Sequence, residues 1–424
     1  MSKGYDFIIG GGGSAGCVLA ARLSEDPSAR VLLLESGGTD WNPLYKMPAG
    51  FAKMTKGIGS WGYQTVPQKH MNNMVINYTQ ARVLGGGSTI NAQIYTRGNR
   101  MDYDEWRQLG CHGWGYEDIL PYFRKSEDND TFNNDYHGKG GPLGVSQPRA
   151  PLPICDAYFE AAGQLGIPRN LDMAGECQDG VGFYQLTQRN AQRCSASVAF
   201  LRPAMNRPNL TIRTGAQVTR IVIEHGRATG VELGGSEVIR AESEVILSSG
   251  AIGSPKLLQL SGVGPADHLQ SVAVQVKLDQ PEVGSNLQDH LDLFTISECT
   301  GDHTYDKYAK PHWSALAGLQ YLLTKRGPVA SSLFETGGFW YAQEGARSPD
   351  IQFHLGLGSG IEAGVAQMGA GVTLNSAYLR PRSRGTVRLA SSDAAVAPLL
   401  DPNYWADPHD REMSIKGLKL AQEI

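Results

Sequence analysis

"FIIGGGGSAGCVLAARLSEDPSARVLLLESGG" occupies residues 7–38 and decides the fold of the chain around it. A run of glycines with one serine stands between two apolar segments, "YDFII" before it and "RVLLLE" after it. Between these segments Ala15, Leu19 and Leu23 recur at helical spacing. The stretch therefore predicts a buried strand, a helix and a second strand parallel to the first.

Two motifs overlap in the glycine run. Read from Gly11 it is G-x-G-x-x-G, in which Gly11 allows a tight turn, Gly13 lets a pyrophosphate approach the backbone, and Gly16 lets helix and strand pack closely. Glu35 follows 19 residues after Gly16, at a position where a carboxylate accepts hydrogen bonds from ribose hydroxyls and repels a 2′-phosphate. This motif predicts an ADP-containing cofactor, either NAD or FAD, and disfavours NADP.

Read from Gly12, the same run is G-x-S-x-G, the nucleophile elbow of hydrolases, with Ser14 as the nucleophile. An elbow belongs inside a sheet that has begun upstream, and only residues 1–4 precede this strand. The phosphate cradle is therefore the stronger interpretation. A tight glycine turn without a ligand is a third interpretation, which Glu35 at the expected distance makes weaker.

Composition excludes several classes of protein. The chain has 424 residues, 38 basic against 42 acidic, and a net charge of −4, so we expect two or three domains and no nucleic-acid partner. Six scattered cysteines, without C-x-x-C or H-E-x-x-H, predict neither a disulfide framework nor a metal site. A strand pattern beginning at Tyr5 leaves no room for a signal peptide, and no apolar run reaches the ~18 residues of a transmembrane segment. We expect a cytoplasmic enzyme, with peripheral attachment to a membrane left open.

Two further stretches are rich in glycine. "ARVLGGGSTINAQIYTRGNRMDYDEW" (81–106) suits backbone lying on a planar ring or a phosphate, and equally suits a second glycine turn. "VILSSGAIGSPKLLQLSGVGP" (245–265) predicts a strand, a turn and a short helix with Pro255 in its first turn. Just upstream, residues 210–233 alternate in the manner of antiparallel strands.

These stretches together resemble the glucose–methanol–choline (GMC) family of FAD-dependent oxidoreductases, over essentially the whole chain. Its two signatures match "ARVLGGGSTINAQIYTRGNRMDYD" and "GAIGSPKLLQLSGVG". Within the family, "MPAGFAKMTKG" and "GPVASSLFETGGFWY" resemble the FAD-dependent L-sorbose dehydrogenases most. The resemblance implies an α/β fold with a discontinuous Rossmann-like FAD-binding domain, residues 1–155 and 195–295. It also implies an α+β substrate domain of a sheet with helices, residues 156–194 and 296–424.

The resemblance makes FAD the expected cofactor and assigns residues to its parts. We expect Gly11, Gly13, Ser14, Ala15 and Gly16 at the pyrophosphate, Glu35 at the adenosine ribose, Val83, Gly86, Asn91 and Ala92 on the flavin side, the backbone of Val218 at the adenine, and Ser249 and Gly250 at the adenosine end.

The activity implied is oxidation of a primary alcohol or a polyol, such as a sorbose-like sugar, to the aldehyde or ketone. A hydride goes to flavin N5 and the electrons pass to a quinone or dye-type acceptor. The alternatives are an oxidase that uses O₂ with a choline-like or aromatic alcohol, or an inactive truncated flavoprotein. Glu335 matches a family position near the substrate, but is equally compatible with no substrate role. His354, in the strand "IQFHLG", points into the substrate cavity or is a core histidine.

The catalytic base is expected outside this sequence. The family's base is a histidine in a segment that we expect beyond Ile424. None of the ten histidines in this sequence matches that role. The closing "DPHDREMSIKGLKLAQEI" predicts a helix without a stop signal, so we expect a missing C-terminal part, which leaves the catalytic residues unknown. Two alternative functions remain, an NAD-linked dehydrogenase and a hydrolase that uses Ser14 as its nucleophile.

Overall fold

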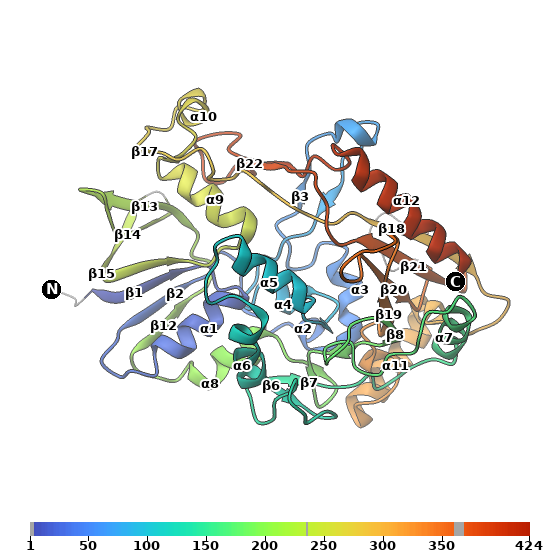
Figure 1. The fold of residues 1–424 in the computed structure, drawn as a ribbon. Coiled ribbons are helices and arrows are strands. Elements are labelled where there is room, and N and C mark those ends of the chain that lie inside the picture. Colours follow the sequence, from blue (N-terminus) through green and yellow to red (C-terminus); the bar gives the residue numbers. More distant parts are fainter. Residues whose placement is uncertain (1–3, 235, 360–368) are drawn as a thin grey trace.

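The computed structural model describes residues 4–234, 236–359 and 369–424. Two sheets organise the chain, one of six strands and one of five. In Figure 1 they lie side by side, with the six-stranded sheet near the N-terminus and the five-stranded sheet near the C-terminus.

The six-stranded sheet has the order β12-β2-β1-β15-β14-β13. Its strands are β12 (Leu210–Arg213), β2 (Val31–Leu34), β1 (Tyr5–Gly10), β15 (Glu237–Leu247), β14 (Arg227–Leu233) and β13 (Val218–Glu224). The first four are parallel, and β13 and β14 continue as antiparallel strands. The predicted N-terminal unit is confirmed: β1 and β2 are parallel, and α1 (Ser14–Leu23) connects them.

One expectation for this sheet was wrong. Residues 210–233 were expected to be antiparallel throughout, but β12 pairs in parallel with β2, Leu210 lying opposite Val31. The chain reaches β12 through α8 (Arg202–Ala204), which packs on the same face as α1. A crossover of this kind returns a strand parallel to its neighbour. Alternation alone cannot show this, because it reports burial and not strand direction.

Alternate residues of β1 and β2 bury opposite faces of the sheet. Ile9 and Leu33 pack against Cys17 and Ala20 of α1. Ile8 and Leu32 belong to the cluster on the other face, which β13 and β14 cover. Apolar runs of this kind are typical of a parallel strand covered on both sides.

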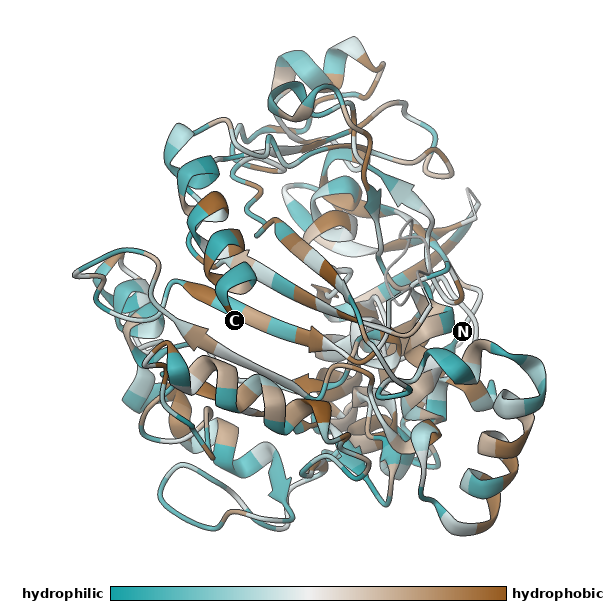
Figure 2. Cartoon of the chain, turned by 90° about the vertical axis from the view of Figure 1, so that its right-hand side faces the viewer, coloured by the Kyte–Doolittle hydropathy of each residue, from teal (hydrophilic) through white to brown (hydrophobic). Residues whose placement is uncertain are grey.

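The five-stranded sheet is antiparallel, in the order β18-β21-β20-β19-β8. Its strands are β18 (Asp292–Glu298), β21 (Gly371–Tyr378), β20 (Ile351–Gly356), β19 (Thr336–Trp340) and β8 (Gly180–Phe183). Helices α7 (Ile154–Gln164) and α12 (Pro408–Glu423) contribute to the core cluster that contains Ile351, Phe353 and Leu355 of β20. In Figure 2, α12, which ends at the C-terminus, crosses in front of these strands. The predicted C-terminal helix is thus confirmed.

The remaining elements are helices and paired short strands outside these two sheets. The helices are α2 (Pro43–Lys46), α3 (Phe51–Met54), α4 (Gly87–Ile90), α5 (Arg100–Gln108), α6 (Tyr116–Ser126), α9 (Gly250–Leu260), α10 (Ala266–Ser271) and α11 (Pro311–Thr324). The paired short strands are β3 (Tyr63–Gln64) with β4 (Asn77–Tyr78), β5 (Ile94–Tyr95) with β9 (Gln185–Leu186), β6 (Glu127–Asn129) with β7 (Leu143–Val145), β10 (Gln188–Arg189) with β11 (Gln192–Arg193), β16 (Val263–Gly264) with β17 (Leu278–Asp279), and β22 (Thr386–Arg388) with β23 (Leu399–Asp401).

Helix α9 begins earlier than expected. It starts at Gly250, directly after β15, so Pro255 lies inside the helix and not in its first turn. The missing N–H of Pro255 removes one helical hydrogen bond. An early start brings the N-terminus of α9 to the carboxyl end of the parallel strands, where a ligand of an α/β sheet binds.

The division of the chain into two domains stays a prediction. The predicted boundary at 295/296 falls inside β18, which belongs wholly to the five-stranded sheet. The segment 156–194 contributes β8 to that same sheet, although it is far away in sequence.

Candidate cofactor and active site

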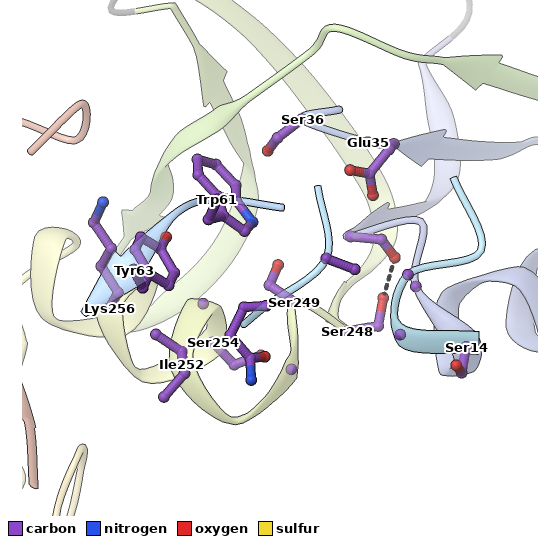
Figure 3. A pocket seen from close by; sticks show the side chains of 18 of the residues that line it. Ser14, Glu35, Ser36, Trp61, Tyr63, Ser248, Ser249, Ile252, Ser254 and Lys256 are labelled. Carbon is purple, nitrogen blue, oxygen red and sulfur yellow. Dashed lines mark hydrogen bonds between the residues drawn. The ribbon is translucent and has the colours of Figure 1, made fainter. Parts of the chain in front are cut away.

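A cavity of about 820 Å³ opens at the carboxyl ends of β1, β2 and β15. Its size lies within the range of small-molecule and cofactor sites, about 300–1,000 Å³. The first turn of α1, the end of β2 and the start of α9 form one part of the wall, as Figure 3 shows for Ser14, Glu35 and Ser249. The carboxyl end of a parallel sheet is the expected ligand position in this class of fold.

The first glycine run leaves no space for side chains around the turn. Gly11 has φ +113°, and a Cβ on it would lie 2.6 Å from the carbonyl oxygen of Ser248. A Cβ on Gly16 would lie 2.0 Å from the carbonyl oxygen of Gly11. Ser14 and Ala15, in the first turn of α1, line the cavity, and N–H groups of a first helical turn have no partner within the helix. Such groups, together with the helix dipole, favour an anion such as a pyrophosphate.

The second glycine run packs directly on the first. The N–H of Gly85 donates to the carbonyl oxygen of Gly12 at 2.7 Å. Gly86 has φ +57°, and a Cβ on it would lie 2.6 Å from the Cα of Gly13. Composition left open whether this run is a ligand wall or only a turn; Gly86 lines the cavity, which is what a ligand wall requires.

The Glu35 carboxylate is buried at the end of β2 and also lines the cavity. It accepts hydrogen bonds from the N–H of Gly12 at 2.9 Å and of Gly37 at 2.7 Å. Burial raises the pKa of this carboxyl, and the two N–H donors oppose that shift. Glu35 thus holds the glycine turn in place. Its contact with a ribose stays a prediction.

Arg193 was missed by sequence reasoning. Its guanidinium is buried and donates to the carbonyl oxygens of Tyr45, Ser88 and Asn91, and to Oδ1 of Asn91 at 2.9 Å. Burial lowers its pKa to about 9. These bonds fix the turn that places Asn91 on the cavity wall. No motif surrounds Arg193, so no signal in the sequence marks it.

Aromatic side chains on the wall were missed as well. Trp61 and Tyr63 are stacked, with ring centroids 5.6 Å apart and an interplanar angle of 8°, and the guanidinium of Arg82 lies 4.4 Å from the Trp61 ring centroid. Both rings line the cavity, as does Phe51 of α3. Trp61 and Tyr63 are drawn in Figure 3 on the side of the cavity toward α9. They belong to irregular or very short segments, where no periodicity marks a function.

The structure brings most of the predicted cofactor residues together. Gly11, Gly13, Ser14, Ala15, Glu35, Gly86, Asn91, Val218, Ser249 and Gly250 line the cavity, whereas Gly16, Val83 and Ala92 do not. Gly16 and Val83 are buried behind the wall, and Val83 packs in the cluster with Met54. Ser248, which sequence reasoning did not select, lines the cavity and donates from its hydroxyl to the carbonyl oxygen of Gly11 at 2.7 Å.

The two predicted substrate residues do not line this cavity. Glu335 is fully buried beside Ser331 and Ser332, and burial raises its pKa to about 7. His354 is half-buried on β20, alternates with the core residues of that strand, and lies with its ring centroid 5.8 Å from that of Tyr184. Burial lowers the pKa of His354. No histidine lines the cavity among the residues that the structure describes.

The sheet order, the glycine cradle and the helix N-terminus at the cavity together define a Rossmann-like, dinucleotide-binding α/β protein. Sequence models of the GMC oxidoreductase family match residues 5–292 and 381–424. This chain belongs to the GMC oxidoreductase family.

Two relatives of known name are equally similar in sequence. The oxygen-dependent choline dehydrogenase of Sinorhizobium medicae is 40% identical over 425 residues, covering 99% of this chain and 77% of the relative. The alcohol dehydrogenase [acceptor] of Pseudomonas putida is 40% identical over 430 residues, covering 99% and 78%. The expectation of the family is confirmed.

Solved structures agree with the fold. Pyridoxine 4-oxidase from Mesorbium loti has a TM-score of 0.87 at 30% identity, covering 99% of this chain and 80% of that one. Formate oxidase from Aspergillus oryzae RIB40, whose structure concerns FAD modification, has a TM-score of 0.90 at 25% identity, covering 100% and 81%. In the part of this chain that the structure describes, no helix is both long and apolar enough to cross a membrane.

Proposed function

We propose that this chain oxidises the hydroxyl-bearing carbon of a small alcohol with FAD held in the glycine-lined cavity. Membership of the GMC oxidoreductase family makes it a FAD-dependent oxidoreductase that acts on CH–OH donors. The observation that carries the proposal is the contact of two glycine runs, Gly85 on Gly12 and Gly86 on Gly13, beside the N-terminus of α1. Only backbone without side chains lets a pyrophosphate and a flat ring approach this closely.

The residues present fit FAD. Gly13, Ser14 and Ala15 would hold the pyrophosphate, and Glu35 would accept from the adenosine ribose. Gly86 and Asn91 would lie beside the flavin, with Val218 and Ser249 at the adenosine end. When bound, FAD supplies the acceptor for the hydride that leaves the carbinol carbon. The chain's own contribution is to hold both reactants in one orientation away from water.

The substrate has two candidates. The resemblance to sorbose dehydrogenases favours a primary alcohol or polyol of the sorbose type. The second candidate is a choline-like alcohol, which the names of the choline dehydrogenases at 38–40% identity favour. Glu335 matches a family position near the substrate, but it does not line the cavity, so it does not decide between the two candidates.

The electron acceptor and the base are also part of the proposal. We infer a quinone or dye-type acceptor, with O₂ as the alternative. Removal of the hydroxyl proton needs a base whose positioning typically contributes ~10²–10⁴-fold to the rate. The resemblance assigns that base to a histidine, which stays a prediction; no histidine lines the cavity among the residues that the structure describes.

Flavin absorbance tests the proposal in two separate stages. The chain is incubated with FAD, desalted, and its visible spectrum recorded; Gly86→Val should retain no flavin, because its Cβ would meet the backbone of Gly13. Gly163→Ala is the matched control, since its Cβ meets nothing within 4 Å. Anaerobic addition of sorbose, choline or benzyl alcohol should then bleach the flavin. Retention of FAD without bleaching by any alcohol would overturn the activity, and no retention would overturn the cofactor site.

A further inference from the structure

Helix α11 presents an apolar face to solvent. This face consists of Trp313, Leu316, Leu319, Leu322 and Leu323, which are 42%, 55%, 55%, 60% and 76% exposed. The helix lies on the side of the molecule that holds the five-stranded sheet (Figure 1). Large apolar side chains that gather on one surface mark an interaction site, whereas single ones do not.

The helix is held to the protein by very few residues. Only Ala317 and Tyr321 are buried, and the Tyr321 hydroxyl donates to the carbonyl oxygen of Ala191 at 2.8 Å. Tyr321 packs with Ala191 and Ala330 in a small cluster. This anchoring side fixes the orientation of the helix, so the apolar face is turned outward by the fold and is not an effect of fraying.

Basic residues frame the apolar face. Residues 307–334 hold four Lys or Arg and no Asp or Glu, in a chain whose net charge is −4. Lys310 lies at the N-terminal end of α11, and Lys325 and Arg326 at the C-terminal end. Among the described residues, Lys310 and Arg326 form no ion pair, whereas Lys307 pairs with Asp302. A helix with Trp and Leu on one face and Lys and Arg around it is typical of binding to an anionic lipid surface.

We propose that α11 docks this chain on an anionic lipid bilayer, with the apolar face in the interface and the basic residues against lipid headgroups. The residues around the apolar face are basic and not acidic, which favours an anionic lipid surface. A second copy of this chain is disfavoured, because its α11 would carry the same positive charge. The segment Pro328–Ala330 contacts both α11 and the segment Pro48–Gly50, which precedes α3. Phe51 of α3 lines the cavity. The docked helix is thus linked through direct contacts to one wall of the cofactor cavity.

Vesicle flotation tests the docking. The FAD-loaded chain is mixed with vesicles of phosphatidylglycerol and phosphatidylcholine in equal parts, and with vesicles of phosphatidylcholine alone. We expect flotation with the first, weakened at least tenfold for the pair Leu316→Ser and Leu323→Ser, and about fivefold for Lys310→Glu. Leu109→Ser and Lys125→Glu, on exposed positions elsewhere, are the matched controls and should float like the original chain.

Sedimentation velocity without lipid tests the alternative occupant of the apolar face, which is a second copy of this chain. The proposal is overturned if the folded chain does not float with anionic vesicles, or if the leucine pair leaves flotation unchanged. It is equally overturned if the chain sediments as a dimer that Leu316→Ser and Leu323→Ser dissociate, because the apolar face is then a contact between copies. Retained flavin absorbance in every variant shows that folding is intact.

Discussion

Gly16 and Gly163 are both helical glycines, but their surroundings differ. A Cβ at Gly16 would lie 2.0 Å from the carbonyl oxygen of Gly11, whereas a Cβ at Gly163 would meet nothing within 4 Å. We expect Gly16→Ala to lower the free energy of unfolding by about 3 kcal/mol, the cost of overpacking against backbone. Gly163→Ala should raise it by up to about 1 kcal/mol, the gain in helix propensity. Urea unfolding measures both, and equal midpoints would contradict the close packing of helix and strand.

Glu335 should make stability fall with rising pH. Burial raises its pKa from 4.5 to about 7, so the folded state binds its proton more tightly than the unfolded state. The stabilisation is complete below pH 4.5 and is lost as the pH rises through 7, by about 3 kcal/mol in total. Glu335→Gln cannot titrate. We therefore expect the free energy of unfolding of Glu335→Gln, relative to that of the original chain, to rise as the pH is raised from 5 to 8. A difference that stays constant over this range would show that Glu335 is ionised throughout.

At the scale of elements, buried charges join four segments outside the cofactor cavity. Arg97 contacts Glu127 of β6 at 2.9 Å, and His137 lies between Glu127 at 2.9 Å and Asp172 at 3.0 Å. Burial lowers the pKa of His137, but hydrogen bonds to Asp172 and Glu127 outweigh it, and the pKa is raised. The arrangement holds the loop after β6 against the segment around residue 172.

Removal of His137 should destabilise these elements in a pH-dependent way. A raised pKa means that the contribution of His137 is complete below about pH 6.5 and is lost as the pH rises through the raised value. We expect His137→Gln to cost about 3 kcal/mol at pH 6, because it leaves buried carboxylates without their partner, and less at pH 9. His225→Gln, at an exposed position, is the control. A loss equal at both pH values would mean that His137 is neutral in the folded protein.

At the scale of the whole molecule, the cavity wall draws on segments from Gly11 to Ala394. A ligand that bridges such distant segments stabilises the folded state as a unit. We expect FAD at 100 times its dissociation constant to add about 2.7 kcal/mol to the free energy of unfolding. Removal of FAD should reverse this shift, and NAD should produce less. Thermal unfolding with each dinucleotide measures it, and a larger shift with NAD would favour an NAD-linked enzyme.

The features that depend on neighbouring residues could be predicted from the sequence, and those that depend on distant residues could not. The β1–α1–β2 unit, the helix at the C-terminus and the glycine turn that lines the cavity were predictable, because glycine spacing and apolar periodicity act within about 30 residues. The direction of β12, the start of α9 and the role of Arg193 were not. Each depends on contacts between residues far apart, such as Arg193 with Asn91.

The sequence by itself therefore determined the first glycine cradle, since turn geometry and helix termini follow from neighbouring residues, and its resemblance to the GMC family pointed to FAD. Only the tertiary structure decided that Gly85 bonds Gly12, that Trp61 and Tyr63 complete the cavity, and that Glu335 and His354 lie apart from it. It also decided that the leucines of α11 face solvent. The physical reason is that side-chain surroundings are set by packing between distant segments, which no local pattern records.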